Sequence, residues 1–171
     1  MVLGGLIALS TGWAVALSPR PASPFSRSRP VVAEADSLTV SHFLKDLELL
    51  GPCRFVVVGP GAILEAVGAF EELRVNDKGL ATVSNDDKSF ECHVRLGEVK
   101  SAVFAKKESG AKTLHIIRLL NDEKTSLLSA ILHADEDGKV EEGAVEWWEA
   151  LRKRFGDEVT LLPEEDGAVE V

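Results

Sequence analysis

Three histidines fall in three neighbouring apolar segments, and imidazole is the side chain that most often binds metal ions in proteins. They are His93 in SFECHVRL, His115 in KTLHIIRLLN and His133 in TSLLSAILHA. Arg95 follows His93 by two residues, and a guanidinium binds carboxylate groups through paired hydrogen bonds. These residues predict a ligand-binding site.

Each of the three segments is expected to form a β-strand, in which successive side chains point to opposite faces. In residues 89–96 the apolar side chains alternate with Glu91, His93 and Arg95. His93 and Arg95 therefore share a face, and we expect both to bind the ligand, with His93 as the candidate for a metal ligand if the ligand carries a metal. His115 is a second candidate, among apolar neighbours and on the opposite face from Arg118. Each histidine could instead be structural or solvated, above all His133 at the end of its strand.

The remaining segments predict an α+β domain. A short helix is expected to run to about Leu50, capped by Ser37 or Ser41 and ended by Gly51. Short strands follow, separated by turn-forming residues, and a helix over residues 143–156 carries an apolar stripe and ends at Gly156. Because strands and helices do not alternate, we expect one large antiparallel β-sheet flanked by an N-terminal and a C-terminal helix.

Charge and motifs exclude several classes of function. The net charge is −9, and removing the three arginines of the acid-free first 33 residues leaves −12 on residues 34–171. An acidic domain repels phosphate backbones, so no nucleic acid is expected as a partner. Hydrolase, zinc-protease and nucleotide-binding motifs are absent, which favours a binding protein over an enzyme. Cys53 and Cys92 have no metal-binding spacing and indicate buried thiols, although a disulfide between them stays open.

The N-terminal segment has the composition of a targeting sequence. Residues 1–17 are apolar, and the next residues are rich in Ser, Pro, Arg and Ala, as in a secretory signal followed by a transit peptide. This arrangement resembles the bipartite presequences of algal plastids. A single membrane anchor with a Pro-rich linker is the alternative. We therefore predict a presequence at 1–33, a folded domain at 34–162 and an acidic tail at 163–171.

The pattern of the folded segment resembles the HemS/ChuX/HutX family of haem-utilisation proteins. The matching residues run from Cys92 to Gly97, from Val103 to Lys107 and from Ile116 to Leu128. The resemblance implies an α+β fold, haem as the cofactor and, for a chain with one such unit, a homodimeric carrier. Glu91 replaces the first histidine of the family's paired motif, and the chain contains no tyrosine.

The resemblance turns the ligand hypothesis into a specific one. Haem needs an axial imidazole and cations for its propionates, which His93 and Arg95 could supply. We expect a haem- or tetrapyrrole-binding carrier or chaperone in the plastid, in the stroma or at the thylakoid surface. One alternative is a ligand-free structural or assembly subunit of a plastid membrane complex, such as a photosynthetic one. Another is a module that binds a second protein through its sheet face.

Overall fold

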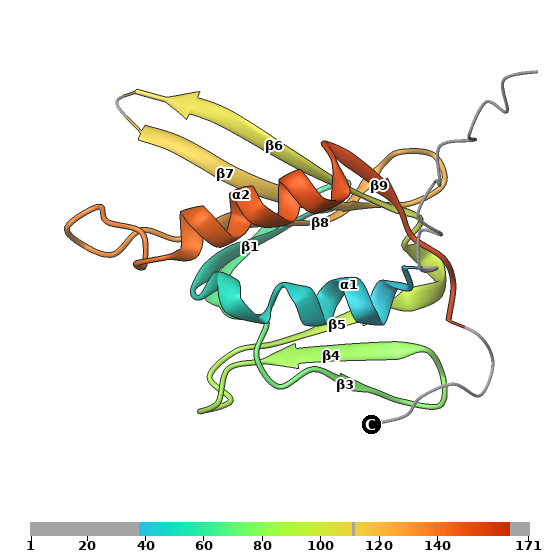
Figure 1. Cartoon of the computed structure of the whole chain (residues 1–171). Coiled ribbons are helices and arrows are strands. Elements are labelled where there is room, and N and C mark those ends of the chain that lie inside the picture. The colour runs from blue at the N-terminus through green and yellow to red at the C-terminus, as the bar shows by residue number, and fades with distance from the viewer. Residues whose placement is uncertain (1–37, 111, 165–171) are drawn as a thin grey trace, which may run out of the picture. The chain divides into compact units, whose positions relative to one another are not determined.

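Nine strands and two α-helices make up the part of the chain that the structure describes, residues 38–110 and 112–164 of a computed structural model (Figure 1). The predicted presequence at 1–33 lies outside the described residues, as does the predicted acidic tail beyond Glu164. The helices are α1 (Val40–Asp46) and α2 (Ala144–Phe155). The strands are β1 (Cys53–Val58), β2 (Ile63–Gly68), β3 (Arg74–Val75), β4 (Leu80–Ser84), β5 (Glu91–Arg95), β6 (Ser101–Ser109), β7 (Lys112–Leu120), β8 (Ser126–Leu132) and β9 (Glu158–Thr160).

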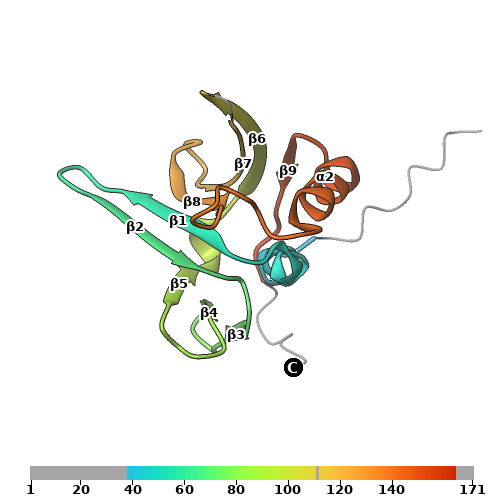
Figure 2. The same cartoon turned by 90° about the vertical axis from the view of Figure 1, so that its left-hand side faces the viewer.

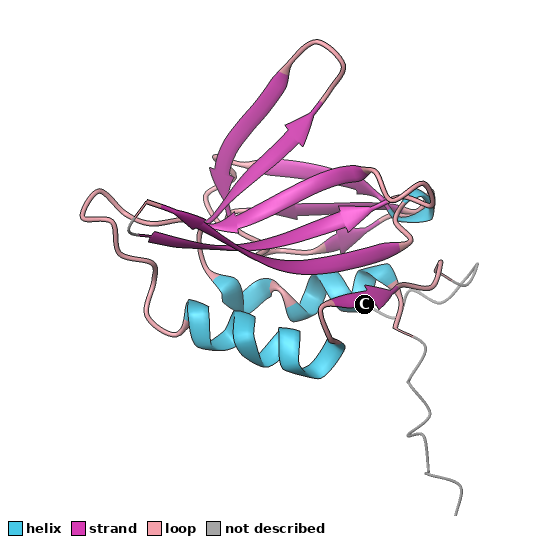
Figure 3. Ribbon diagram, turned by 90° about the horizontal axis from the view of Figure 1, so that it is seen from above, coloured by secondary structure: helices cyan, strands magenta, loops and turns pink. Residues whose placement is uncertain are grey.

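The strands form two antiparallel sheets. The larger has six strands in the order β2-β1-β8-β7-β6-β9, and the smaller has three in the order β3-β4-β5. Figure 3 shows both helices on one side of the strands. The predicted α+β class, with a large antiparallel sheet and a helix near each end of the domain, is confirmed. The histidine segments do not share one sheet, because His93 lies in the small sheet and His115 in the large one.

Helix α1 begins at a different residue from the one that the sequence predicts. Thr39 is its N-cap, and the Thr39 side chain accepts a hydrogen bond from the backbone N–H of His42. The prediction of a serine cap is therefore wrong. A threonine hydroxyl can accept the same hydrogen bond from a backbone N–H at the helix start, so threonine caps a helix as serine does. After a short 3-10 helix at Glu48–Leu50, Gly51 turns the chain with φ of 65°, a conformation that favours glycine.

Helix α2 closes the helical side of the molecule, as its apolar stripe predicts. Ala144, Trp148 and Leu151 are its buried residues, and Gly156 caps its end with φ of 88°. The indole N–H of Trp147 donates to the Asp46 carbonyl oxygen at 2.9 Å and so joins α2 to the end of α1. No described helix is long and apolar enough to cross a membrane.

Aromatic side chains connect the elements of the core. Phe43 of α1 contacts Phe104 of β6, with ring centroids 6.1 Å apart. Phe55 of β1 lies 4.8 Å from Phe70 and 4.5 Å from Phe90. Because Phe90 directly precedes β5, its contact with Phe55 of β1 packs the small sheet against the large one.

Both cysteines are free, so the alternative of a disulfide between them is wrong. Cys53 is buried, and burial raises the pKa of its thiol to about 12. Burial also raises the pKa of the half-buried Cys92 thiol. Neither thiol is activated, because only a thiolate is a strong nucleophile or metal ligand.

Candidate functional site

His93 lies on the exposed outer face of β5, as strand alternation predicts. It pairs directly with Thr82 of β4, and the Thr82 hydroxyl oxygen lies 2.9 Å from His93 Nδ1. This hydrogen bond holds the ring and leaves Nε2 without a hydrogen bond from any described residue. If Nδ1 carries the proton and donates it to Thr82, the Nε2 lone pair is available to a metal ion.

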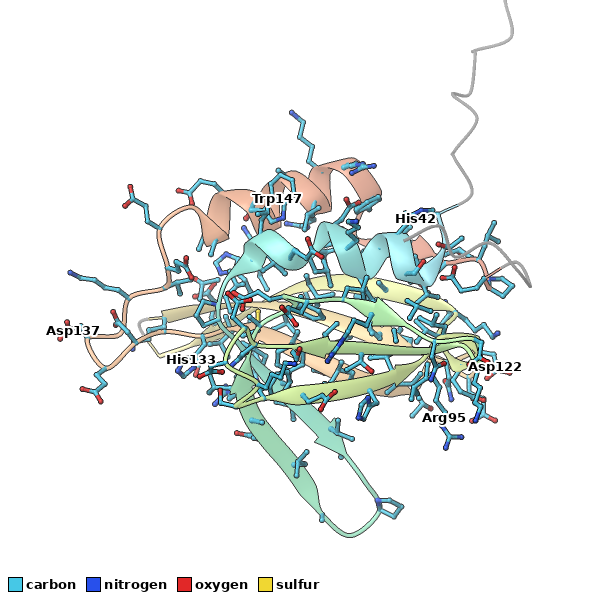
Figure 4. All side chains as sticks on the ribbon, turned by 90° about the horizontal axis from the view of Figure 1, so that it is seen from below. His42, Arg95, Asp122, His133, Asp137 and Trp147 are labelled. Carbon is cyan, nitrogen blue, oxygen red and sulfur yellow. The ribbon has the colours of Figure 1, made fainter. Side chains whose placement is uncertain are left out.

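Arg95 shares the outer face with His93, and both side chains are exposed. Glu91, the third polar residue of this face, pairs instead with Arg74 of β3 at 3.3 Å. Within residues 38–110 and 112–164, Arg95 has no ion-pair partner. Figure 4 shows Arg95 pointing away from the ribbon. Its guanidinium can therefore bind an added carboxylate.

The site also contains a mostly apolar slot along β5, the edge strand of the small sheet. Its volume is about 240 Å³. His93 and Arg95 line it together with residues of β1, β5, β7 and β8 and of the 3-10 helix Leu96–Glu98: Val57, Cys92, Val94, Glu98, Leu119, Leu127 and Leu128. An apolar slot with an imidazole and a guanidinium suits a flat apolar ligand that carries a metal and an acid group.

The slot is smaller than the roughly 300–1,000 Å³ of cavities that enclose drug-sized ligands. A large flat ligand can therefore insert only one edge into it. Val57, which is 39% exposed, extends the apolar wall outward from the slot. The arrangement suits a ligand that stays partly exposed to solvent.

The structure does not bring His115 to this slot. His115 lies on the face of β7 that α2 covers, is 9% exposed, and meets the Trp148 ring edge-on at 5.0 Å. Leu119 lines the slot from the same face of β7, about 13 Å further along the strand at the usual rise per residue. His115 therefore belongs to the contact between α2 and the sheet.

Burial and the charge of Lys106, in that order, lower the pKa of His115 from its ordinary value of 6.5. Lys106 pairs with His115 across the strands and forms an ion pair with Glu149 of α2. Glu149 and, more weakly, Glu108 of β6 oppose the shift. The folded state therefore resists protonation of His115 more than the unfolded chain does.

This difference predicts acid sensitivity. A lowered folded-state pKa leaves stability unaffected above pH 6.5 and reduces it as the pH falls from 6.5 through the folded-state pKa. We expect wild type to lose more stability between pH 7 and pH 5 than His115→Leu, measured by urea unfolding. Leu49→Ala is the control, because it changes a side chain that is 69% exposed and carries no titratable group, so it should keep the pH dependence of wild type. Equal losses in wild type and His115→Leu would contradict the assignment.

The other two histidines lie apart from the site. His133 follows β8, where its N–H donates to the Pro52 carbonyl oxygen, and Figure 4 places it at the opposite end of the strands from Arg95. His42 is exposed on α1 beside Thr39. Within the described part of the chain, no three His, Cys, Asp or Glu residues gather where they could hold a metal ion.

Sequence reasoning missed Thr82 and most of the slot. Val57, Leu127 and Leu128 are ordinary aliphatic residues, and they reach the site because β1 pairs with β8 across a long stretch of sequence. Thr82, unlike the aliphatic residues, could have been predicted from the sequence. A hairpin between residues 80–84 and 91–95 places it directly opposite His93.

No protein-family model and no curated protein matches this chain, whereas solved structures do. The haem-binding protein ChuX superposes with a TM-score of 0.58 at 14% identity, over 67% of this chain and 71% of that one. Protein AGR_C_4470 from Agrobacterium tumefaciens gives 0.57 at 16% identity, over 66% of this chain and 64% of that one. Holo-PhuS, a haem-binding protein from Pseudomonas aeruginosa, gives 0.55 at 18% identity, over 77% of this chain and 36% of that one.

These similarities concern the backbone. The chain spans less than two thirds of the A. tumefaciens protein and about a third of PhuS. At such identities they establish the fold and leave the ligand to the residues of the site. The chain has a ChuX-like α+β fold, as its sequence pattern predicts.

Proposed function

We propose that this protein binds haem, or a related tetrapyrrole, at the slot beside β5. His93 Nε2 would ligate the iron, and Arg95 would bind a propionate. The observation that carries the proposal is that these two residues line one apolar slot and that Arg95 has no ion-pair partner among the described residues. The haem-binding proteins of the same fold support it.

The small slot favours a carrier or chaperone over an enzyme. A macrocycle that inserts only one edge into the slot would remain partly exposed to solvent. It would therefore dissociate easily, and a carrier must be able to release its ligand. His115 is not part of this proposal, because it lies beneath α2. No tyrosine exists to serve as a ligand, so His93 is the proposed axial donor.

Titration of the purified protein with haemin tests the proposal. Wild type should shift the Soret band, and His93→Ala should leave it close to that of free haemin because the axial ligand is lost. Arg95→Gln should keep the shifted band and weaken affinity roughly tenfold, since a charge-assisted hydrogen bond is lost. His133→Ala is the matched control and should resemble wild type. An unchanged Soret shift in His93→Ala would rule out the proposed ligand.

A second function is favoured by the departures from the family pattern. Glu91 stands where the paired motif has histidine, and Arg74 holds its carboxylate. A chain that had lost its ligand could serve as a structural or assembly subunit of a plastid membrane complex, such as a photosynthetic one. Co-migration with such a complex on native gels, without haem, would support this function. A free haem-loaded protein would exclude it.

The location and the oligomeric state belong to the same proposal. A plastid address, in the stroma or at the thylakoid surface, rests on the composition of residues 1–33, and N-terminal sequencing of the mature protein would test it. A start near Ala35 would support a removed presequence. A homodimer is proposed from the resemblance alone. Light scattering would test it, and added salt should favour association because each acidic domain repels its copy.

A further inference from the structure

Hairpin β1–β2 projects from the rest of the strands (Figure 2) and exposes an unusual concentration of aliphatic side chains. Among the described residues, seven large hydrophobic side chains are exposed, and five of these belong to the hairpin. They are Val57 at 39%, Val58 at 63%, Ile63 at 65%, Leu64 at 68% and Val67 at 48%. An exposed apolar cluster of this kind marks an interaction surface.

The two faces of the hairpin differ in their neighbours. Val57 and Leu64 are cross-strand partners on the face that leads to the candidate slot. Val58 and Ile63 are partners on the opposite face, which Val67 extends. The segment 55–64 contains no charged residue. The first charges are Arg54 and Glu65, which pair at 3.8 Å at the base of the exposed part.

The backbone of β2 is unpaired along its outer edge. β2 ends the six-stranded sheet and pairs only with β1. The N–H of Gly59 donates to the Ala62 carbonyl oxygen at 2.8 Å. Because hydrogen-bonded and non-bonded pairs alternate in an antiparallel ladder, this bond sets the pattern along the hairpin. The N–H and C=O groups of Ile63, Glu65 and Val67 therefore face outward.

The other sheet edges of the described domain are protected, as edges of soluble proteins usually are. β9 is three residues long, and its Glu158 forms an ion pair with Lys124. β3 has two residues, one of them Arg74, and β5 presents charged side chains. β2 also carries one charged residue, Glu65, which forms an ion pair with Arg54 of the neighbouring strand. By contrast with the other edges, however, β2 has six residues with no proline, lysine or bulge. It has the features of a strand that is completed by a partner.

The chemistry of this edge discriminates between three kinds of partner. Lipid would cover the aliphatic side chains but leave the outward N–H and C=O groups without hydrogen bonds, which is costly in hydrocarbon. A second copy would bring together two domains with −12 each on residues 34–171, which repel. A strand from a neutral or basic protein satisfies the backbone and avoids the repulsion.

We propose that the outer edge of β2 binds an extended segment of another protein as an added β-strand. Its alternate aliphatic side chains would cover Val58, Ile63 and Val67, and its backbone would pair with Ile63, Glu65 and Val67. Lysine or arginine beside those aliphatic residues would suit the acidic domain. The site is separate from the proposed haem ligand, so it applies to the haem-free protein as well.

The test uses the full chain and a synthetic peptide in which valine alternates with lysine and threonine. We expect saturable binding by fluorescence anisotropy, with amide NMR shifts centred on Ile63, Glu65 and Val67. The same peptide with N-methylated valines is the control for backbone pairing and should not bind. Val67→Pro removes an outward N–H without removing a bond to β1. It should weaken binding about fivefold to tenfold relative to Val67→Ala, which controls for the lost side chain.

Several outcomes would overturn the proposal. They are no binding of the peptide, equal binding of its N-methylated form, or equal affinities of Val67→Pro and Val67→Ala. Light scattering that shows a dimer in wild type and a monomer in Val58→Asp would assign the hairpin to a second copy. Co-sedimentation of the chain with neutral phosphatidylcholine vesicles would assign it to lipid. The haemin spectrum of Val67→Pro should match wild type, so a failure here is separate from a failure of haem binding.

Discussion

Trp148→Ala is expected to destabilise the protein by about 3–5 kcal/mol, the usual cost of removing a fully buried tryptophan. Trp148 is 0% exposed and meets Phe104 edge-on at 5.6 Å and His115 at 5.0 Å. The charged groups of Lys106 and Arg152 each lie 5.8 Å from its ring centroid. Truncation would leave a cavity between α2 and the large sheet. The loss would be a large part of the roughly 5–15 kcal/mol that stabilises a domain of ordinary size.

Urea unfolding followed by far-UV circular dichroism measures this loss. Trp147, the neighbouring tryptophan, provides a matched comparison. The indole N–H of Trp148 has no hydrogen-bond partner among the described residues, whereas the indole N–H of Trp147 has one. Trp148→Phe should therefore lose only packing volume. Trp147→Phe should lose about 1 kcal/mol with its hydrogen bond. Leu49→Ala, at a residue 69% exposed, should change little. If Trp148→Ala cost no more than Leu49→Ala, α2 would not pack as described.

Gly68→Ala is expected to cost about 1–3 kcal/mol, although alanine is ordinarily tolerated in a strand. A Cβ atom at Gly68 would lie 2.1 Å from Cδ1 of the Phe90 ring, far inside contact distance. Phe90 is 8% exposed and lies against Phe55, so its ring has little room to move. The overlap would push the small sheet away from the end of the β1–β2 hairpin.

A double-mutant cycle with Phe90→Leu measures the overlap directly. The smaller side chain should remove most of the penalty, so the two changes together should cost less than the sum of the single changes. Gly61→Ala is the control, because a Cβ there meets nothing within 4 Å. Strictly additive losses would mean that the Gly68 penalty has a cause other than Phe90.

Local patterns predicted both helices, most of the strands, and His93 and Arg95 of the candidate site. Alternation in residues 89–96 placed His93 and Arg95 on one face, because a strand turns successive side chains to opposite sides wherever it pairs. The helical spacing of apolar residues and the glycine at position 156 predicted α2, because both signals lie within the helix segment itself. The short β9 was missed, since three residues carry no periodic signal. The exposed apolar character of 57–64 was also missed, because an apolar run indicates burial unless the sheet order leaves it at an edge.

By itself the sequence determined the fold class, the face that His93 and Arg95 share, and the acidic charge, all of which follow from residue type and local backbone geometry. Only the tertiary structure decided that β5 belongs to a separate small sheet and that β1 lies beside β8. Those pairings form the slot, cover His115 with Trp148 and leave β2 at an edge. They depend on which distant apolar surfaces bury one another best, a property of the whole folded chain that no local pattern records.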